Sequence, residues 1–203
     1  MNTLAPVKAK KPNMKSAIER MGEGTYGKEV DRVDWPYYDE LTLTAGVNEY
    51  TLFNQSQGKT LAQTNYFGNG IFPQAQEFRI KALKIEYLAA GTKTSADIIS
   101  LYKLLWDSTL QFQIQNKPPS YQKTMFEAMG IPMGFHVTPG VAGDNESIMS
   151  YGRFLGIDPL NRQIFLAALT PWTTKINFYG ALPAALLGDR IRISWNGILR
   201  RLV

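Results

Sequence analysis

The sequence predicts a mainly β protein: an antiparallel β-sandwich with one or two short inserted helices and a flexible N-terminal arm. Many short segments alternate apolar and polar residues, long polar connections separate them, and one segment has clear helical periodicity. Aromatic residues make up 12% of the 203-residue chain, and aromatic side chains favour strands. Because the strands do not alternate regularly with helices, a parallel α/β sheet is disfavoured.

We predict a flexible basic arm over residues 1–34 and a β-sandwich body over residues 35–203. Two prolines and a run of lysines disfavour a stable helix at the start of the chain, although a short helix near residues 14–21 is an alternative. Three glycines follow in quick succession. The basic residues of the arm are candidates for binding nucleic-acid phosphate: Lys8, Lys10, Lys11, Lys15 and Arg20.

The first part of the body reads as strand, turn and strand, over Leu41–Thr44 and Val47–Phe53. Residues 54–76 are rich in Gln, Asn and Gly, which predicts a long loop. Phe78–Leu88 has the clearest alternation in the chain, with one phase slip at Ala82-Leu83. A slip of this kind predicts a β-bulge.

Ser95–Trp106 repeats its apolar residues at helical spacing, so we predict a helix with Ser95 as its N-cap. Thr109–Gln115 then alternates strictly and predicts a strand whose apolar residues face inward. A further short helix is expected within residues 120–129.

The second half of the chain is less regular. Residues 130–161 contain several Gly and Pro, which predicts loops with short strands. Three strands are expected after them, and residues 198–203 can extend the last one past Gly197: Ile164–Leu169, Lys175–Tyr179 and Arg190–Trp195.

Charge is distributed in three blocks. Residues 1–20 carry a net charge of +4, residues 23–49 carry −5 and residues 150–203 carry +5, within a whole-chain charge of +5. Opposite blocks are either a chance pattern of solvated faces or segments that meet, within one subunit or between neighbours. On the second interpretation, the candidate subunit contacts are Asp31, Asp34, Asp39, Glu40, Arg190, Arg192, Arg200 and Arg201.

The sequence offers little support for catalysis or for a bound cofactor. It has no cysteine and one histidine, His136, so we expect no metal site. The glycines at 22, 24 and 27 match Gly-x-Gly-x-x-Gly but lack a preceding strand, and a hinge is the better interpretation. The acid pairs Asp39-Glu40 and Asp144 with Glu146 are the remaining enzyme candidates, as glycosidase carboxylates. We therefore expect a protein that is not an enzyme and needs no cofactor.

A cationic arm followed by a β body of this size resembles the single jelly-roll coat proteins of icosahedral viruses and bacteriophages. The resemblance is architectural, covers the whole chain and rests on no diagnostic motif. It implies that the first and last strands, about Leu41–Phe53 and Asp189–Leu199, lie side by side in one sheet. It also agrees with a helix inserted between strands, as at Ser95–Trp106.

The resemblance implies a self-assembling capsid subunit of the virion, made in the host cytoplasm, with the arm facing inward. Its partners would be other copies of itself, viral nucleic acid through the arm, and, among further candidates, other capsid proteins or an internal membrane. The alternative is a carbohydrate- or receptor-binding β-sandwich of a phage or cell surface. That module would use exposed aromatic side chains, with Tyr66, Phe67, Trp172 and Tyr179 as candidates.

Overall fold

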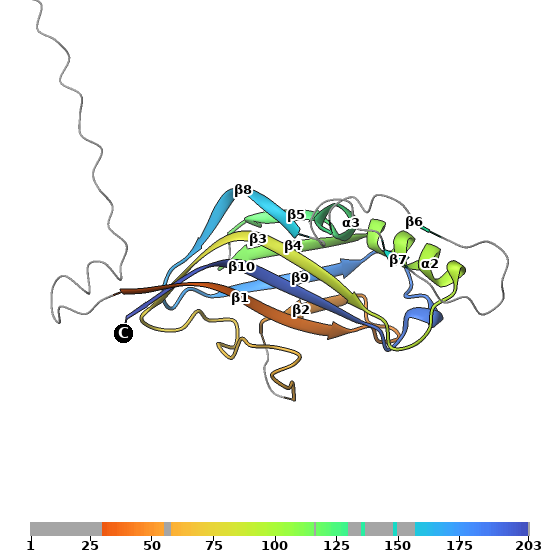
Figure 1. Cartoon of the computed structure of the whole chain (residues 1–203), viewed down its shortest axis with the longest axis horizontal. Helices are drawn as coiled ribbons and strands as arrows, with labels where there is room; N and C mark the ends of the chain where they lie inside the picture. Colours follow the sequence, from red (N-terminus) through yellow and green to blue (C-terminus); the bar gives the residue numbers. More distant parts are fainter. Residues whose placement is uncertain are drawn as a thin grey trace, which may run out of the picture.

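The computed structural model describes residues 30–54, 58–115, 117–129, 135–136, 148–149 and 157–202. Its body consists of two four-stranded antiparallel sheets stacked in two layers (Figure 1). The first sheet has the order β1-β10-β3-β8, from Val30–Thr42, Arg190–Leu202, Gln76–Leu88 and Ile157–Leu166. The second has the order β2-β9-β4-β5, from Glu49–Leu52, Trp172–Phe178, Ser108–Ile114 and Tyr121–Thr124. The prediction of a mainly β, antiparallel body is confirmed.

The remaining elements lie in the connections. They are helix α2, the short helix α3, a 3₁₀ turn η1 and the two-residue strands β6 and β7, which pair with each other: Ser95–Trp106, Met125–Ala128, Ala184–Leu186, Phe135–His136 and Ile148–Met149. Helix α2 joins β3 to β4, so it is inserted between strands of different sheets.

The first strand differs most from its prediction. β1 starts at Val30 and pairs over its whole length with β10, from Val30 opposite Leu202 to Thr42 opposite Arg190. Residues 30–34, which we expected in the arm, are therefore part of the first sheet. The expected strand at Leu41–Thr44 covers only the end of β1. Sequence patterns miss β1 because two consecutive acids, Asp39 and Glu40, are both buried in it.

The bulge in β3 is confirmed, one residue before the predicted slip. Ile80 lies opposite Gly197 of β10 and Ala82 lies opposite Asn196, so Lys81 has no partner of its own. Gly197 is required at this point. A Cβ added there would stand 2.1 Å from the carbonyl oxygen of Arg79, a distance that no side chain can occupy.

Helix α2 has the bounds that its periodicity predicts, Ser95–Trp106, but its cap is one residue earlier. Thr94 is the N-cap: its hydroxyl accepts from the Asp97 backbone N–H, and the Asp97 carboxylate accepts from the Thr94 N–H. This reciprocal capping box satisfies two backbone donors that the first turn leaves unpaired. The side of the helix that faces the body carries the buried residues Leu101, Leu104 and Leu105.

Other elements are longer than the sequence predicts. Residues 121–128 form a strand followed by the one-turn helix α3, where only a short helix was expected. β8 begins at Ile157, well before the predicted Ile164, and β10 continues without interruption through Gly197 to Leu202.

The core between the sheets is rich in aromatic side chains. Trp195 and Phe112, on opposite sheets, meet edge to face with ring centroids 4.9 Å apart. The Trp195 indole N–H donates to the Thr174 hydroxyl at 2.9 Å, so the buried polar atom is satisfied. Around them pack further buried rings, those of Tyr37, Phe53, Tyr66, Phe72, Phe78, Tyr121 and Trp172.

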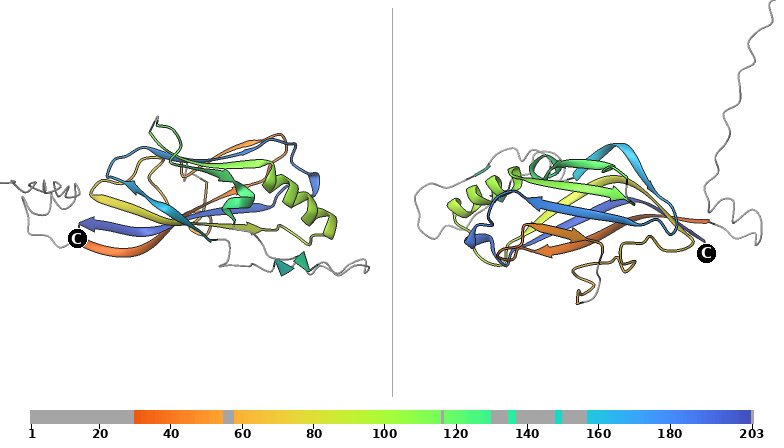
Figure 2. Two further views of the ribbon diagram at one scale, coloured as in Figure 1. Left: turned by 90° about the horizontal axis from the view of Figure 1, so that it is seen from above. Right: turned by 180° about the vertical axis from the view of Figure 1, so that it is seen from behind.

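The loops gather at two ends of the body (Figure 2). At one, which we call the terminal end, β1 begins, β10 ends and the loop 167–171 meets the loop 53–75, through Phe72 N–H to the Thr170 carbonyl at 3.0 Å. At the other, the helical end, α2 lies close to the segment 179–189. Lys93 there donates to the Ala185 carbonyl at 2.6 Å.

We expect Gly197→Ala to destabilise the protein by about 2–4 kcal/mol, because the β3 and β10 backbones must separate to admit a methyl group. Urea unfolding followed by tryptophan fluorescence measures the change. Gly91→Ala is the matched control, since a Cβ at Gly91 meets nothing within 4 Å and its φ is not positive. Equal stability of the two variants would contradict the close approach.

Candidate functional site

The free edge of β1 is covered by residues 58–66, which we call the edge loop. The Tyr38 N–H donates to the Asn65 side-chain oxygen at 2.8 Å, and the Asn65 amide donates to the Pro36 carbonyl at 2.7 Å. The Tyr38 carbonyl accepts from the Asn65 N–H and from the Thr64 hydroxyl. An uncovered edge strand is a template for pairing with another chain. Here the loop uses the backbone groups of Pro36 and Tyr38, so this middle part of β1 is not offered for strand addition.

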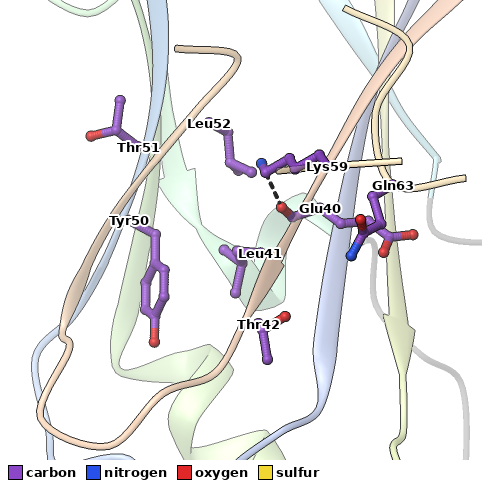
Figure 3. A pocket seen from close by; sticks show the side chains of 8 residues that line it. All are labelled: Glu40, Leu41, Thr42, Tyr50, Thr51, Leu52, Lys59 and Gln63. Carbon is purple, nitrogen blue, oxygen red and sulfur yellow. Dashed lines mark hydrogen bonds between the residues drawn. The ribbon is translucent and has the colours of Figure 1, made fainter. Parts of the chain in front are cut away.

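Asp39 fixes the edge loop to the body. Its side chain is 1% exposed and accepts from the backbone N–H groups of Glu40 and Phe53, at 3.0 and 2.7 Å. Lys59 completes the set with an ion pair at 2.6 Å to the same carboxylate, and also donates to the Glu40 carbonyl (Figure 3). A buried carboxylate is tolerated only when paired and hydrogen-bonded, as this one is.

Glu40 points to the outer face of the first sheet and joins the two long strands. Its carboxylate accepts from Arg190 at 3.0 Å and from the Arg192 guanidinium. Arg192 also donates to the Ala62 carbonyl at 2.8 Å, so the edge loop, β1 and β10 share one network. Between β1 and β2 this network borders a pocket of about 300 Å³, lined by Leu41, Tyr50, Leu52 and Gln63 among others (Figure 3).

The oppositely charged segments of the sequence therefore meet within one chain. Besides the Glu40 pairs, Arg201 lies 2.9 Å from Asp31, and Lys175 lies 3.2 Å from Glu49. Arg200 pairs instead with Glu77 of β3 at 3.3 Å, and Asp34 is exposed opposite Ile198. A role as subunit contacts stays a prediction for the eight candidates Asp31, Asp34, Asp39, Glu40, Arg190, Arg192, Arg200 and Arg201. The arm residues Lys8, Lys10, Lys11, Lys15 and Arg20 lie outside the described residues.

A second buried carboxylate, at Asp189, holds the helical end together. It accepts from the Tyr87 hydroxyl and from the Ala90 N–H at 2.7 Å, and Lys93 lies 2.7 Å away. The sequence alone assigned Asp189 no role. Its partners precede it by about a hundred residues, and no local pattern marks them.

An exposed apolar surface lies at the terminal end. Phe67, Ile71 and Leu169 are 57, 49 and 59% exposed and border a pocket of about 450 Å³. We call these three residues the terminal-end surface. The loops that carry them are held by backbone hydrogen bonds, including Leu169 N–H to the Phe72 carbonyl at 2.9 Å. Such a surface is preorganised, which lowers the entropic cost of contact with a partner.

Backbone strain gathers at the same end. The non-glycine residues with positive φ in the described parts of the chain are Phe53, Asn69, Ala75, Gln115 and Leu169. All five lie in the loops of the terminal end. Left-handed conformations of bulky residues are costly and persist where surrounding contacts impose them, often at functional sites.

The helical end carries a second exposed apolar surface. Trp106 is 60% exposed and packs edge to face on Phe126, with ring centroids 4.7 Å apart. With Tyr102, Lys103 and Asp107, these rings line a pocket of about 300 Å³. We call Trp106 and Phe126 the helical-end surface.

The other sequence candidates are distributed as follows. Tyr66 and Trp172 are core residues, joined by a 2.9 Å hydrogen bond from the indole N–H to the hydroxyl, whereas Phe67 and Tyr179 are exposed. His136 lies in β6, and its side chain is not described; Asp144, Glu146 and the glycines at 22, 24 and 27 lie outside the described residues.

Among the described residues, no group of three His, Asp or Glu side chains is placed to hold a metal ion. Within the same residues, no helix is long and apolar enough to cross a membrane. No protein-family model matches the chain, and no curated protein matches its sequence.

We expect Asp39→Asn to destabilise the protein by about 2–4 kcal/mol, because Lys59 keeps a partly buried charge without its counterion. Urea unfolding measures this, and faster proteolysis within residues 54–65 would report release of the edge loop. Glu49→Gln is the control: its pair with Lys175 is solvent-exposed, so the expected loss is about 0–1 kcal/mol. Similar losses in both variants would contradict the anchoring role of Asp39.

Burial raises the pKa of Tyr37 to about 12, and it also raises the pKa values of Tyr66, Tyr87 and Tyr121. In the unfolded chain these phenols lose their protons near pH 10, while the native state keeps them. The ionisation of these phenols therefore leaves the free energy of unfolding unchanged well below pH 10 and lowers it as the pH rises from 10 to 12.

Tyrosinate absorbance at 295 nm and urea unfolding across pH 8–12 test this expectation. The native protein should ionise fewer tyrosines at pH 11 than the urea-unfolded protein does. Tyr37→Phe should flatten part of the alkaline decline. If the native and unfolded titrations coincide, the buried environment of these phenols is refuted.

Proposed function

We propose that the chain is a self-assembling structural subunit of a viral or phage shell, with a jelly-roll body. The strand order carries this proposal. Jelly rolls are two four-stranded sheets built from Greek keys, with the first and last strands adjacent. The orders β1-β10-β3-β8 and β2-β9-β4-β5 agree with that scheme, and β1 and β10 are adjacent. The first strand is Val30–Thr42 and not the Leu41–Phe53 that the sequence suggested.

The two apolar surfaces support self-assembly as the function of this protein. Rigid, exposed aromatic and aliphatic clusters are typical of protein interfaces, and monomers rarely keep large ones. The terminal-end and helical-end surfaces lie at opposite ends of the body, so they cannot cover each other within one chain. A contact between unlike ends of successive copies is heterologous and can repeat around a closed shell.

The basic residues near the start of the chain support an inward-facing arm. The chain enters β1 at the terminal end, so the residues before Val30 start from there. Four or five charges bind phosphate weakly in one copy, but many copies in one assembly act together.

Light scattering and electron microscopy of the purified full chain test the proposal. We expect particles much heavier than the 22.8 kDa chain, retaining nucleic acid at low salt. Replacing Lys8, Lys10, Lys11 and Lys15 by Gln should reduce nucleic-acid retention while the body stays folded. A monomer at all salt concentrations, with or without added nucleic acid, would refute the proposal.

The surfaces allow a sharper version of the same experiment. Phe67→Ser/Leu169→Ser and Trp106→Ser should each abolish large particles, whereas Leu61→Ser, an exposed control outside both surfaces, should not. Mixing the two defective proteins leaves one intact pair of unlike ends and should yield a discrete dimer. Dimerisation of either variant alone would instead indicate contact between like ends.

One observation favours the second candidate, a carbohydrate-binding module. The outer face of the second sheet is mostly polar, with Thr109, Gln111, Gln113 and Asn177, and the exposed Tyr179 contacts Thr109. Its charged residues Lys175 and Glu49 pair with each other. Amides and hydroxyls suit sugar hydroxyls. Glycan-array binding that is lost in Gln111→Ala/Tyr179→Ala, but kept when Lys8, Lys10, Lys11 and Lys15 are replaced by Gln, would favour this function.

A further inference from the structure

A group of cations on β3 and β8 forms no ion pair within the described part of the chain. Most described lysines and arginines lie within 4.0 Å of a carboxylate, as Lys59, Lys84, Lys93 and Arg192 do. Arg79, Lys81 and Arg162 are exposed, and no ion pair joins any of the three to another residue in the described ranges. Exposed charges that have no carboxylate partner among the described residues are available to a ligand.

The sheet register brings these cations together around one aromatic ring. Arg79 of β3 lies directly opposite Phe165 of β8. Ile80 is opposite Ile164 and Ala82 is opposite Pro159, so residues 160–163 stand against Lys81 alone. Arg162 is one of these four residues, so it and Lys81 belong to the same irregularity between β3 and β8. Phe165 is 44% exposed. We call Arg79, Lys81, Arg162 and Phe165 the β3–β8 patch.

The neighbouring acids do not neutralise the patch. Glu77, two residues before Arg79, pairs with Arg200, and Glu86 pairs with Lys84. Asp158 of β8 pairs with Lys123 and accepts from the Tyr121 hydroxyl. Asp34 lies in the row of Arg79 but two strands away on β1, where exposed Arg32 offsets it. The local field is positive.

We propose that the β3–β8 patch binds the phosphate backbone of single-stranded nucleic acid. Charge complementarity carries the proposal, since guanidinium and ammonium groups bind phosphates and release their counterions. Phe165 adds a ring face among the cations, and stacking of bases on aromatic rings is how single strands are held without sequence preference. A duplex would keep its bases stacked on each other and leave this ring unused.

An anionic membrane is the competing polyanion. Peripheral membrane binding combines basic residues with an apolar face that enters the headgroup region, usually on an amphipathic helix. The β3–β8 patch lies on a sheet and has one half-exposed ring, which suits stacking better than insertion.

The inference deepens the proposed function, because it adds a nucleic-acid site on the body to the one proposed for the arm. It rests on that function only for its biological use, since a single subunit would also bind. The patch includes the early part of β3, near the terminal end where the chain enters β1. One nucleic-acid strand could thus contact both the patch and the arm, and binding at one site would raise its effective concentration at the other.

Fluorescence anisotropy of a labelled dT20 oligonucleotide, titrated with the full chain at several salt concentrations, tests the patch. We expect Arg79→Gln/Lys81→Gln to weaken binding roughly tenfold. The salt slope should fall by about 1.4, because each phosphate that is no longer neutralised accounts for about 0.7. The control Lys103→Gln/Lys117→Gln removes the same charge from exposed sites that form no ion pair among the described residues, and it should change affinity less than twofold.

Two further probes separate nucleic acid from other polyanions. Phe165→Leu should weaken dT20 binding several-fold and leave heparin binding unchanged, because heparin has no bases to stack. Equal losses in the two double variants, or wild-type affinity in the patch variant, would overturn the site. Patch-dependent binding to phosphatidylglycerol vesicles without oligonucleotide binding would overturn the choice of ligand.

Light scattering of the same samples keeps the two proposals apart. Particles that form normally but bind dT20 independently of the patch would overturn this inference alone. Patch-dependent binding by a protein that remains monomeric would support it and overturn the shell.

Discussion

The pairing of β1 with β10 is the constraint on which the rest of the structure depends. It joins the first and last strands of the described body over 13 residues and places β10 between β1 and β3. Because β10 is central, its alternate residues close the core, while Arg190 and Arg192 meet Glu40 on the outer face. The edge loop can cover β1 only because this pairing fixes where β1 lies. The Asp39 and Glu40 networks are then two consequences of one register.

Elements governed by local pattern could be predicted from sequence, and those governed by distant partners could not. Ser95–Trp106 repeats its leucines at helical spacing, and Phe78–Leu88 shows its bulge as a phase slip. β1 was placed wrongly, because buried Asp39 and Glu40 break the alternation and their partners, Lys59, Arg190 and Arg192, lie 19–152 residues away. The shift of the cap from Ser95 to Thr94 has a similar cause: both can cap, and the Asp97 carboxylate decides.

The candidate surfaces were still less accessible to sequence. The charge blocks indicated that early acids and late bases would meet, and several do. The cations of the β3–β8 patch, in contrast, are brought together by the strand register, which the sequence pattern does not show. Phe67 and Trp172 are equally plausible surface aromatics in the sequence, yet one is exposed and the other is in the core. Which apolar residues stay outside depends on how the loops at each end close over the sandwich.

The central position of β10 also determines the order in which the body can form. During synthesis β1 leaves the ribosome well before β10, the strand that pairs with it in the described part of the chain. Until then β3 lacks one neighbour as well. Contacts this distant make folding slow and leave strand edges open to neighbouring chains. Newly made chains therefore spend time in a state that can join others incorrectly.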